Sequence, residues 1–291
     1  MPSQHGRDRM PEARPWPDWL EVVNPDVSLG HIHHVLFDFD GTLSVIREGW
    51  EKIMRPLMVE MICNGANPSP EERTAIEAEV WEYVDRSTGI LTIRQMEWLA
   101  NAARRHGLAR EPKDARTYKQ IYNERLLRPV RERLGRLTRG EVTQDDLMIR
   151  GARAFLKQLH ARGVTMYLCS GTDHAYVLEE AGALGIVELF TGGVYGALDD
   201  TEANDKARII ERILDGHKLR GVELLVVGDG PVEIRHAKAR NAVALGIASD
   251  EVRRSGLNRR KRERLLAAGA DLIVADFAHA RELASFLMGG G

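Results

Sequence analysis

Two carboxylates separated by one residue, Asp38 and Asp40, stand at the end of an apolar stretch that begins at His34. A strand places alternate side chains on the same face, so both carboxylates point the same way. Two adjacent negative charges raise the pKa of one carboxyl and form a site for a cation. The pair predicts a nucleophilic carboxylate beside a carboxyl that gives and takes protons, with Gly41 and Thr42 as donors to an anion. The alternative is a turn with two solvated aspartates.

Strands and helices that alternate along the chain must position this pair. Short apolar runs that end at turn residues predict buried parallel strands at 34–40, 164–169, 223–227, 242–247 and 271–275. Segments of helical periodicity lie at 151–161, 173–184, 205–215, 231–240 and 277–288. We therefore expect an α/β fold, a parallel sheet with helices on both faces and ligands bound past the carboxyl ends of its strands.

The segment between the first two of these strands is different in kind. Its helix-forming stretches are 50–61, 70–85, 92–106 and 114–134. An insert of about 95 residues is too long for a loop, which predicts a separate helical domain over the active edge of the sheet. The expected division is 1–30 as an N-terminal tail, 31–49 with 146–291 as the catalytic core, and 50–145 as an inserted all-helical cap domain. The tail is rich in Pro and charge, but Trp16, Trp19 and Leu20 are expected to pack on the body.

Composition limits the classes of partner and compartment. The 291 residues include 41 Lys and Arg against 43 Asp and Glu, a formal charge of -2, which makes nucleic acid an unlikely main partner and disfavours an anionic membrane surface. The two cysteines, Cys63 and Cys169, cannot form a disulfide framework, and this favours a reducing, cytoplasmic compartment. No apolar run reaches the roughly 18–20 residues of a membrane span. A soluble protein with a small-molecule partner is expected, and its oligomeric state is left open.

The string FDFDGTLS at 37–44 resembles the first motif of the haloacid dehalogenase-like hydrolase superfamily. The resemblance implies a Rossmann-like core with a helical cap of the first type, and three further motifs in order along the chain. The second motif matches Ser170 in LCSGT, whose hydroxyl would hold a phosphate oxygen together with the N–H groups of Gly171 and Thr172 at a helix start. Without the family context, this serine would be interpreted as a helix cap, a common role for serine.

The third and fourth motifs of the family also have counterparts. Lys206 would neutralise the nucleophile and the phosphoryl group, and Asp229 and Glu233 follow in GDGPVE. The resemblance implies Mg²⁺ bound by Asp38, Asp229 and the main-chain carbonyl of Asp40, with Glu233 acting through water. Taken alone, the lysine would be a solvated side chain and Glu233 an acid at a helix start.

The reaction that the resemblance implies is phosphoryl transfer through Asp38. Phosphatases and phosphomutases of the family keep the second acid of the first motif, here Asp40. Asp38 would attack phosphorus, and Asp40 would protonate the leaving oxygen and then activate water. Mg²⁺, Lys206 and Ser170 would hold the charge of the transferring group.

We therefore expect an enzyme of the phosphoglycolate-phosphatase-like branch. It would be a Mg²⁺-dependent phosphomonoester hydrolase for a small metabolite such as a sugar phosphate or phosphoglycolate. One alternative is a phosphosugar mutase with the same catalytic residues. Another is a non-catalytic module that binds a phosphometabolite on the same scaffold.

Residues outside the four motifs are candidates for substrate selection. Arg47 suits a phosphate or carboxylate, although a hinge or surface arginine is an equal reading. Within the insert, Thr88, Thr92 and Gln95 surround a turn that resembles the cap loop of phosphoglycolate-phosphatase-like relatives. The alternative is a simple turn with Thr92 as a helix cap. The basic run at 253–264 predicts a solvated helix face or a contact between protomers, rather than an RNA site.

Overall fold

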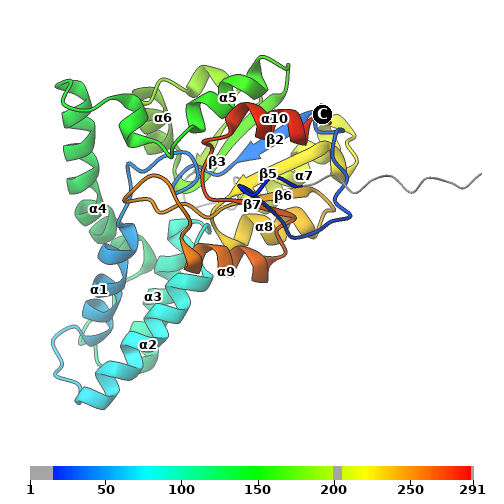
Figure 1. The fold of residues 1–291 in the computed structure, drawn as a ribbon. Coiled ribbons are helices and arrows are strands. Elements are labelled where there is room, and N and C mark those ends of the chain that lie inside the picture. The colour runs from blue at the N-terminus through cyan, green and yellow to red at the C-terminus, as the bar shows by residue number, and fades with distance from the viewer. Residues whose placement is uncertain (1–15, 199–204, 290–291) are drawn as a thin grey trace, which may run out of the picture.

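A seven-stranded sheet forms the centre of the part of the chain that the structure describes, residues 16–198 and 205–289 of a computed structural model (Figure 1). The strands are β1 (Leu20–Val22), β2 (His34–Phe37), β3 (Thr165–Asp173), β4 (Gly193–Ala197), β5 (Leu224–Gly228), β6 (Val243–Ile247) and β7 (Leu272–Val274). Their order across the sheet is β1-β7-β6-β5-β2-β3-β4. All neighbours are parallel except β1 and β7, so the expected α/β fold is confirmed.

Two of these strands differ from the sequence prediction. The tail prediction is wrong for residues 20–22, which form β1 antiparallel to β7 at the edge of the sheet. The strand β4 was not expected either, because Gly193 and Gly196 weaken the strand pattern. The expected packing of the N-terminal aromatic residues is confirmed: Trp16 contacts the ring of Phe286 edge-on, and Trp19 stacks on His279.

Helices cover both faces of the sheet. The core helices are α5 (Ala152–His160), α6 (His174–Ala183), α7 (Lys206–His217), α8 (Pro231–Lys238), α9 (Arg259–Ala268) and α10 (Ala280–Leu287). Alternation along β2 separates two apolar clusters, since Val35 and Phe37 pack with residues of α5, α6 and α10 while Leu36 packs with residues of α7, α8 and α9. The sheet is therefore the buried middle layer of three.

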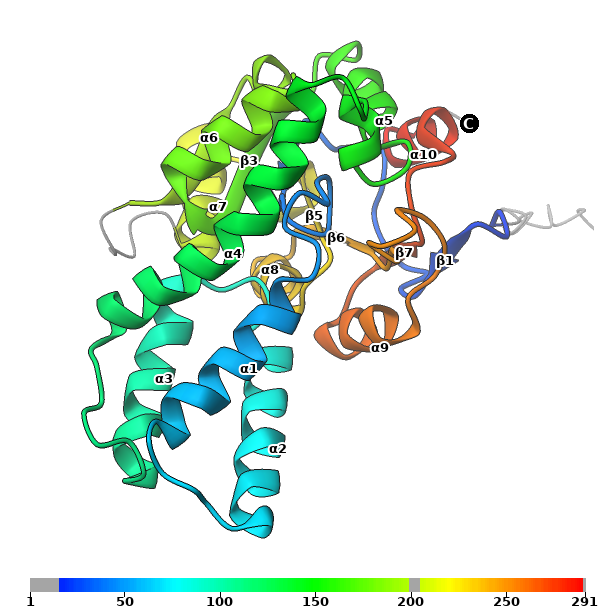
Figure 2. The same cartoon turned by 90° about the vertical axis from the view of Figure 1, so that its left-hand side faces the viewer.

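Residues 50–138, inserted between β2 and α5, form a helical arm, which projects from the core (Figure 2). Its helices are α1 (Trp50–Cys63), α2 (Pro70–Arg86), α3 (Thr92–His106) and α4 (Ala115–Thr138). Local interactions define the ends of these helices. At the start of α2, the side chains of Ser69 and Glu72 each accept a hydrogen bond from the other's backbone N–H, and α3 ends at Gly107, whose backbone is in the left-handed conformation. Within the described ranges, every helix is too short or too polar to cross a membrane.

The order in which strands are added to the sheet switches sides at β2, and this switch creates a crevice at the edge of the sheet. After β2 the chain builds β3 and β4 on one side, then returns to add β5, β6 and β7 on the other. The segments that follow β2 and β5 therefore diverge at a crevice beyond the carboxyl ends of the strands. The turn that joins α2 to α3 lies against the same edge, since Gly89 approaches Glu233 and Ile90 approaches Gly171.

Candidate active site

Asp38 and Asp40 lie just beyond the carboxyl end of β2, at the crevice. The chain turns there at Gly41, whose φ of +78° is one that only glycine adopts readily. A side chain at this position would also collide with the carboxylate of Asp229. The turn therefore needs glycine both for its backbone angle and for the close approach of the segment that follows β5.

Lys206 begins α7 and reaches the candidate nucleophile. Its Nζ lies 2.7 Å from Oδ1 of Asp38 and 3.1 Å from Oε2 of Glu233, and all three side chains are buried. Burial raises the pKa of Asp38 well above its ordinary value, and the Lys206 ammonium opposes that rise. Burial alone would lower the pKa of Lys206, but the two carboxylates raise it instead. Lys206 is therefore a permanent positive charge against Asp38.

Asp40 is held by hydroxyl groups of β3. Its Oδ2 accepts hydrogen bonds from the hydroxyls of Ser170, at 3.0 Å, and Thr172, at 3.3 Å. Burial raises the pKa of Asp40, while the nearby Arg47 and these hydrogen bonds oppose the rise. A raised pKa favours the protonated carboxyl that a general acid requires.

The surroundings of Ser170 differ from the prediction. This residue was expected beyond its strand at a helix start, but β3 continues to Asp173 and α6 begins at His174. The reason is long-range, because pairing with β4 extends as far as Asp173 opposite Ala197. The N–H of Thr172 donates to the Ser170 hydroxyl oxygen at 3.1 Å, so this predicted phosphate donor is engaged within the protein.

Three carboxylates converge beneath the crevice. Asp38, Asp229 and Glu233 each offer one oxygen, and these oxygens lie within 4.8 Å of one another. Oδ1 of Asp40 is buried without a hydrogen-bond partner. The hydroxyl of Thr42 lies 3.1 Å from Asp38 and 3.4 Å from Asp229, behind the carboxylates rather than in the cavity. Mg²⁺ prefers such oxygen donors and retains several waters, so this donor set fits the ion.

Glu233 has two interactions that the sequence reasoning treated as alternatives. Its Oε1 accepts a hydrogen bond from the backbone N–H of Gly230 at 2.8 Å, which caps α8. Its Oε2 contacts Lys206. The side chain is completely buried, so it acts both as a helix-start acid and as part of the carboxylate cluster.

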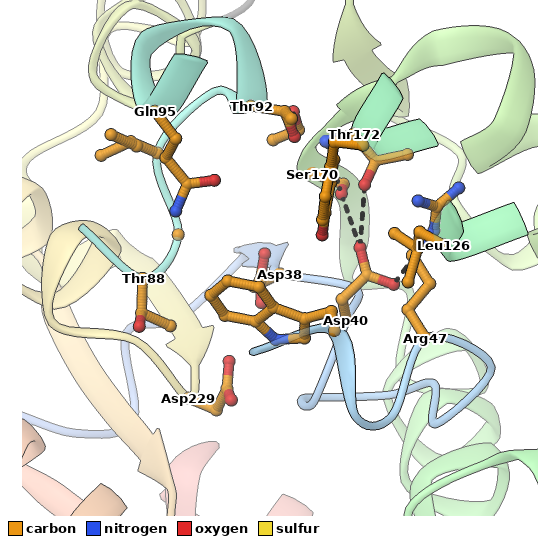
Figure 3. Close-up of a pocket in the computed structure, with 15 residues that line it drawn as sticks. Asp38, Asp40, Arg47, Thr88, Thr92, Gln95, Leu126, Ser170, Thr172 and Asp229 are labelled. Atoms are coloured by element: carbon orange, nitrogen blue, oxygen red, sulfur yellow. Dashed lines mark hydrogen bonds and ion pairs between the residues drawn. The ribbon is translucent and has the colours of Figure 1, made fainter. Parts of the chain in front are cut away.

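A cavity of about 70 Å³ lies between these carboxylates and the helical arm (Figure 3). The core side presents Asp38, Asp40, Ser170, Gly171, Thr172 and Asp229, and the arm side includes Thr88, Thr92 and Gln95. Figure 3 shows these arm side chains across the cavity from Asp38 and Asp40. Lys206 and Glu233 lie beneath the cavity rather than on its wall. The structure therefore gathers every predicted site residue at the cavity or directly behind it.

The turn at Thr88–Thr92, between α2 and α3, brings the arm into contact with the core. A Cβ on Gly89 would lie 2.5 Å from Oε2 of Glu233 and 3.3 Å from Nζ of Lys206. The hydroxyl of Thr92 donates to the carbonyl of Gly171 at 3.4 Å, whereas the amide of Gln95 donates to the hydroxyl of Ser87 at 3.2 Å. Only glycine permits this close approach, which places the turn directly over the carboxylates.

Lys261 is a site residue that the sequence reasoning missed. It was placed in a solvated basic run, but it is 5% exposed and its Nζ lies 2.6 Å from Asp229 and 2.7 Å from Glu251. The basic run at 253–264 was misleading because its consecutive charged residues obscure which of them lies on the buried face of the helix. Lys261 lies on the same face of α9 as the buried Leu265 and Ala268, at spacings of four and seven residues, and that period was the available signal.

We expect Lys261→Met to lower the free energy of unfolding by about 3 kcal/mol at neutral pH, because the buried Asp229 and the partly buried Glu251 lose their counter-charge. Urea denaturation without added metal measures the change. The control is Lys157→Met, which replaces an exposed lysine on α5. Equal stability of the two variants would mean that the Asp229–Lys261–Glu251 contacts do not stabilise the fold.

Comparison with known proteins places the chain in a family. The sequence profile of the haloacid dehalogenase-like hydrolases matches residues 32–239, which span β2 to the end of α8. The chain belongs to the haloacid dehalogenase-like hydrolase family. The expectation of a hydrolytic enzyme of this family is therefore confirmed. No curated protein matches the sequence.

Several solved structures share the fold of this chain at low sequence identity. A predicted phosphoglycolate phosphatase from Haemophilus somnus is 16% identical over 88% of this chain and 99% of its own, with a TM-score of 0.57. The β-phosphoglucomutase of Clostridium difficile is 14% identical over 85% and 92%, with a TM-score of 0.54. CbbY from Rhodobacter sphaeroides, solved in complex with phosphate, is 16% identical over 85% and 95%, with a TM-score of 0.51. These likenesses establish the shared fold.

Proposed function

We propose that this hydrolase is a Mg²⁺-dependent phosphomonoesterase for a small phosphorylated metabolite such as a sugar phosphate or phosphoglycolate. One observation carries the proposal: Asp38, at the cavity wall, is paired with the Lys206 ammonium at 2.7 Å while Asp40 lies on the same wall. A carboxylate nucleophile, a neighbouring proton donor and a buried positive charge are what phosphoryl transfer through an aspartate requires.

The reaction would proceed in two displacements at Asp38. A carboxylate oxygen of Asp38 forms a bond to phosphorus as the bond to the leaving oxygen breaks, and Asp40 gives its proton to that oxygen. Water then attacks the aspartyl-phosphate, Asp40 takes up a proton from it, and inorganic phosphate leaves. Lys206 stabilises the charge of the transferring group throughout because its ammonium does not need to move.

The metal-binding residues of the proposal are Asp38, Asp229 and the main-chain carbonyl of Asp40, with Glu233 behind them. When bound, Mg²⁺ would neutralise the phosphoryl oxygens and reduce their repulsion by the carboxylates. Lys261 fixes one oxygen of Asp229, while its other oxygen lies on the side of Thr42. The protein thus holds Asp229 in one orientation before the ion binds.

The helical arm would act as a cap that encloses the substrate. Its turn at Thr88–Thr92 lies over the carboxylates, and Trp50, Tyr122 and Leu126 complete the cavity wall. Exclusion of water from the cavity strengthens the electrostatic interactions with the phosphoryl group.

Metal dependence tests the proposal directly. We expect chelation of divalent cations to abolish hydrolysis of p-nitrophenyl phosphate, and added Mg²⁺ to restore it. Asp229→Asn should raise the Mg²⁺ concentration for half-maximal activity at least about tenfold, because a ligand loses its charge. The exposed Asp26→Asn serves as the control. Full activity after chelation would contradict the metal assignment.

A further inference from the structure

Arg47 is the cation on the cavity wall, and its charge is already compensated by the protein. Its Nη2 lies 2.6 Å from Oε1 of Glu180, and its Nε lies 3.1 Å from both carboxylate oxygens of that residue. The two residues are 5% and 1% exposed. Burial raises the pKa of Glu180 to about 7, and the Arg47 guanidinium opposes that rise. Arg47 is therefore neither a surface arginine nor an uncompensated positive charge.

The rest of the wall that faces the leaving group is neutral. The arm presents hydroxyl and amide groups from Thr88, Thr92 and Gln95, and aromatic surface from Trp50 and Tyr122. Among the described residues that line the cavity, Arg47 is the one with a positive charge.

The Lys206 ammonium beneath the cavity would interact with a different part of the substrate. Lys206 contacts Asp38 and Glu233, so its charge serves the phosphoryl group at the site of attack. The charges of the site thus divide into two regions. At the phosphorus, Lys206 and the proposed Mg²⁺ would supply positive charge among the carboxylates of Asp38, Asp229 and Glu233, whereas a neutral region surrounds the group that leaves.

We infer that the leaving group of the substrate is an uncharged, polyhydroxylated alcohol, an inference that rests on the proposed phosphatase activity. Such an alcohol would exchange hydrogen bonds with water for hydrogen bonds donated to the side-chain oxygens of the threonines and Gln95, whose own hydrogens are bonded within the protein, and its C–H faces would pack on Trp50. A carboxylate or a second phosphate would lose its hydration in this cavity without gaining a counter-charge, which is costly. Phosphoglycolate-like acids are therefore poor substrates.

The same charge distribution disfavours the phosphomutase alternative. A mutase passes through a sugar that carries two phosphate groups, and both must be held within the closed cavity. One of them would lie among Thr88, Thr92, Gln95 and the Arg47–Glu180 pair, where the net charge is zero. Hydrolysis of a monophosphate needs positive charge only at Asp38, where Lys206 and the proposed Mg²⁺ would supply it.

A pair of substrates that differ in one group tests the inference. Glycerol 3-phosphate and 3-phosphoglycerate differ by a CH₂OH group in place of a carboxylate. At about pH 8, where Glu180 is ionised, we expect kcat/KM to favour glycerol 3-phosphate at least tenfold. Where turnover is slow, the inhibition constants of the two esters against p-nitrophenyl phosphate hydrolysis give the same ratio. Equal values, or a preference for the acid, would overturn the inference.

A variant at Glu180 tests the cause of the preference. Glu180→Gln keeps the size and one acceptor but removes the charge, which leaves the Arg47 guanidinium with Asp40, 3.9 Å away, as its remaining carboxylate and makes it available to a substrate carboxylate. We expect the ratio to shift at least fivefold toward 3-phosphoglycerate, mainly through KM. Glu179→Gln, its exposed neighbour on α6, should leave the ratio unchanged. An unchanged ratio in folded Glu180→Gln would contradict the role of the ion pair.

The two hypotheses fail in different ways. If wild-type protein with Mg²⁺ hydrolyses none of p-nitrophenyl phosphate, glycerol 3-phosphate and 3-phosphoglycerate, the proposed function is wrong, and the inference is rejected with it. If it hydrolyses that ester but prefers 3-phosphoglycerate, only the inference is wrong. The wild-type ratio requires no variant, so the inference stays testable even where Glu180→Gln does not fold.

Discussion

Asp38→Asn should lower kcat for p-nitrophenyl phosphate by at least about 10⁴-fold, because the amide cannot act as the nucleophile. Asparagine has nearly the same size as aspartate, and its amide oxygen can still accept the hydrogen bond from Lys206 while its NH₂ donates to the Thr42 hydroxyl. The cavity should therefore keep its shape, and the loss of turnover should come from the chemistry. Initial rates at saturating substrate and Mg²⁺, with circular dichroism to confirm folding, measure this effect.

Two further observations make the Asp38 result decisive. The exposed Asp26→Asn variant should retain wild-type rates, which controls for the loss of a carboxylate elsewhere. Fluoroberyllate, which mimics a phosphoryl group bound to a carboxylate, should inhibit the wild type and fail to bind Asp38→Asn. Retention of more than a tenth of the activity by Asp38→Asn would exclude this residue as the nucleophile.

Asp40→Asn should reduce the hydrolysis of alkyl phosphates by about 10²–10⁴-fold, because the leaving alkoxide loses its proton donor. The loss for p-nitrophenyl phosphate should be much smaller, since p-nitrophenolate leaves readily without a proton. Burial raises the pKa of Asp40, which favours the protonated state of the wild-type residue before attack. The measured quantity is the variant-to-wild-type ratio of kcat/KM for glycerol 3-phosphate and for p-nitrophenyl phosphate.

The comparison between the two substrates controls the experiment internally. Damage to metal binding or folding would lower both rates by the same factor, whereas loss of a general acid lowers mainly the alkyl phosphate rate. Asparagine still accepts hydrogen bonds from Ser170 and Thr172, so the position of the side chain should be preserved. Equal losses on both substrates would show that Asp40 is not the proton donor.

The roles assigned to the site residues remain predictions, but their positions follow from local rules. Asp38 and Asp229 each follow a short apolar strand, and the carboxyl ends of parallel strands meet at one edge. The periodicity of apolar residues and the positions of turn residues were enough to locate five strands and the helical arm, because both signals are properties of consecutive residues. The four motifs could be recognised in the sequence for the same reason, since each lies within a few residues.

What the sequence did not reveal depends on partners that lie far apart in the chain. The strand β1 has only three residues in a Pro-rich region, and it becomes a strand because β7 offers an unpaired edge. The extension of β3 beyond Ser170 likewise requires β4. Short segments have weak local preferences, and tertiary contacts decide their conformation.

By itself, the sequence determined the family, the α/β architecture and the group of residues at the catalytic edge. The tertiary structure decided which charges face the substrate. Arg47 pairs with Glu180, 133 positions away in the sequence, and Lys261 reaches Asp229 from α9. The physical reason is that burial and the position of counter-charges are properties of three-dimensional packing. The sequence alone therefore does not distinguish an arginine or lysine that is solvated from one that is paired or one that is free to bind an anion.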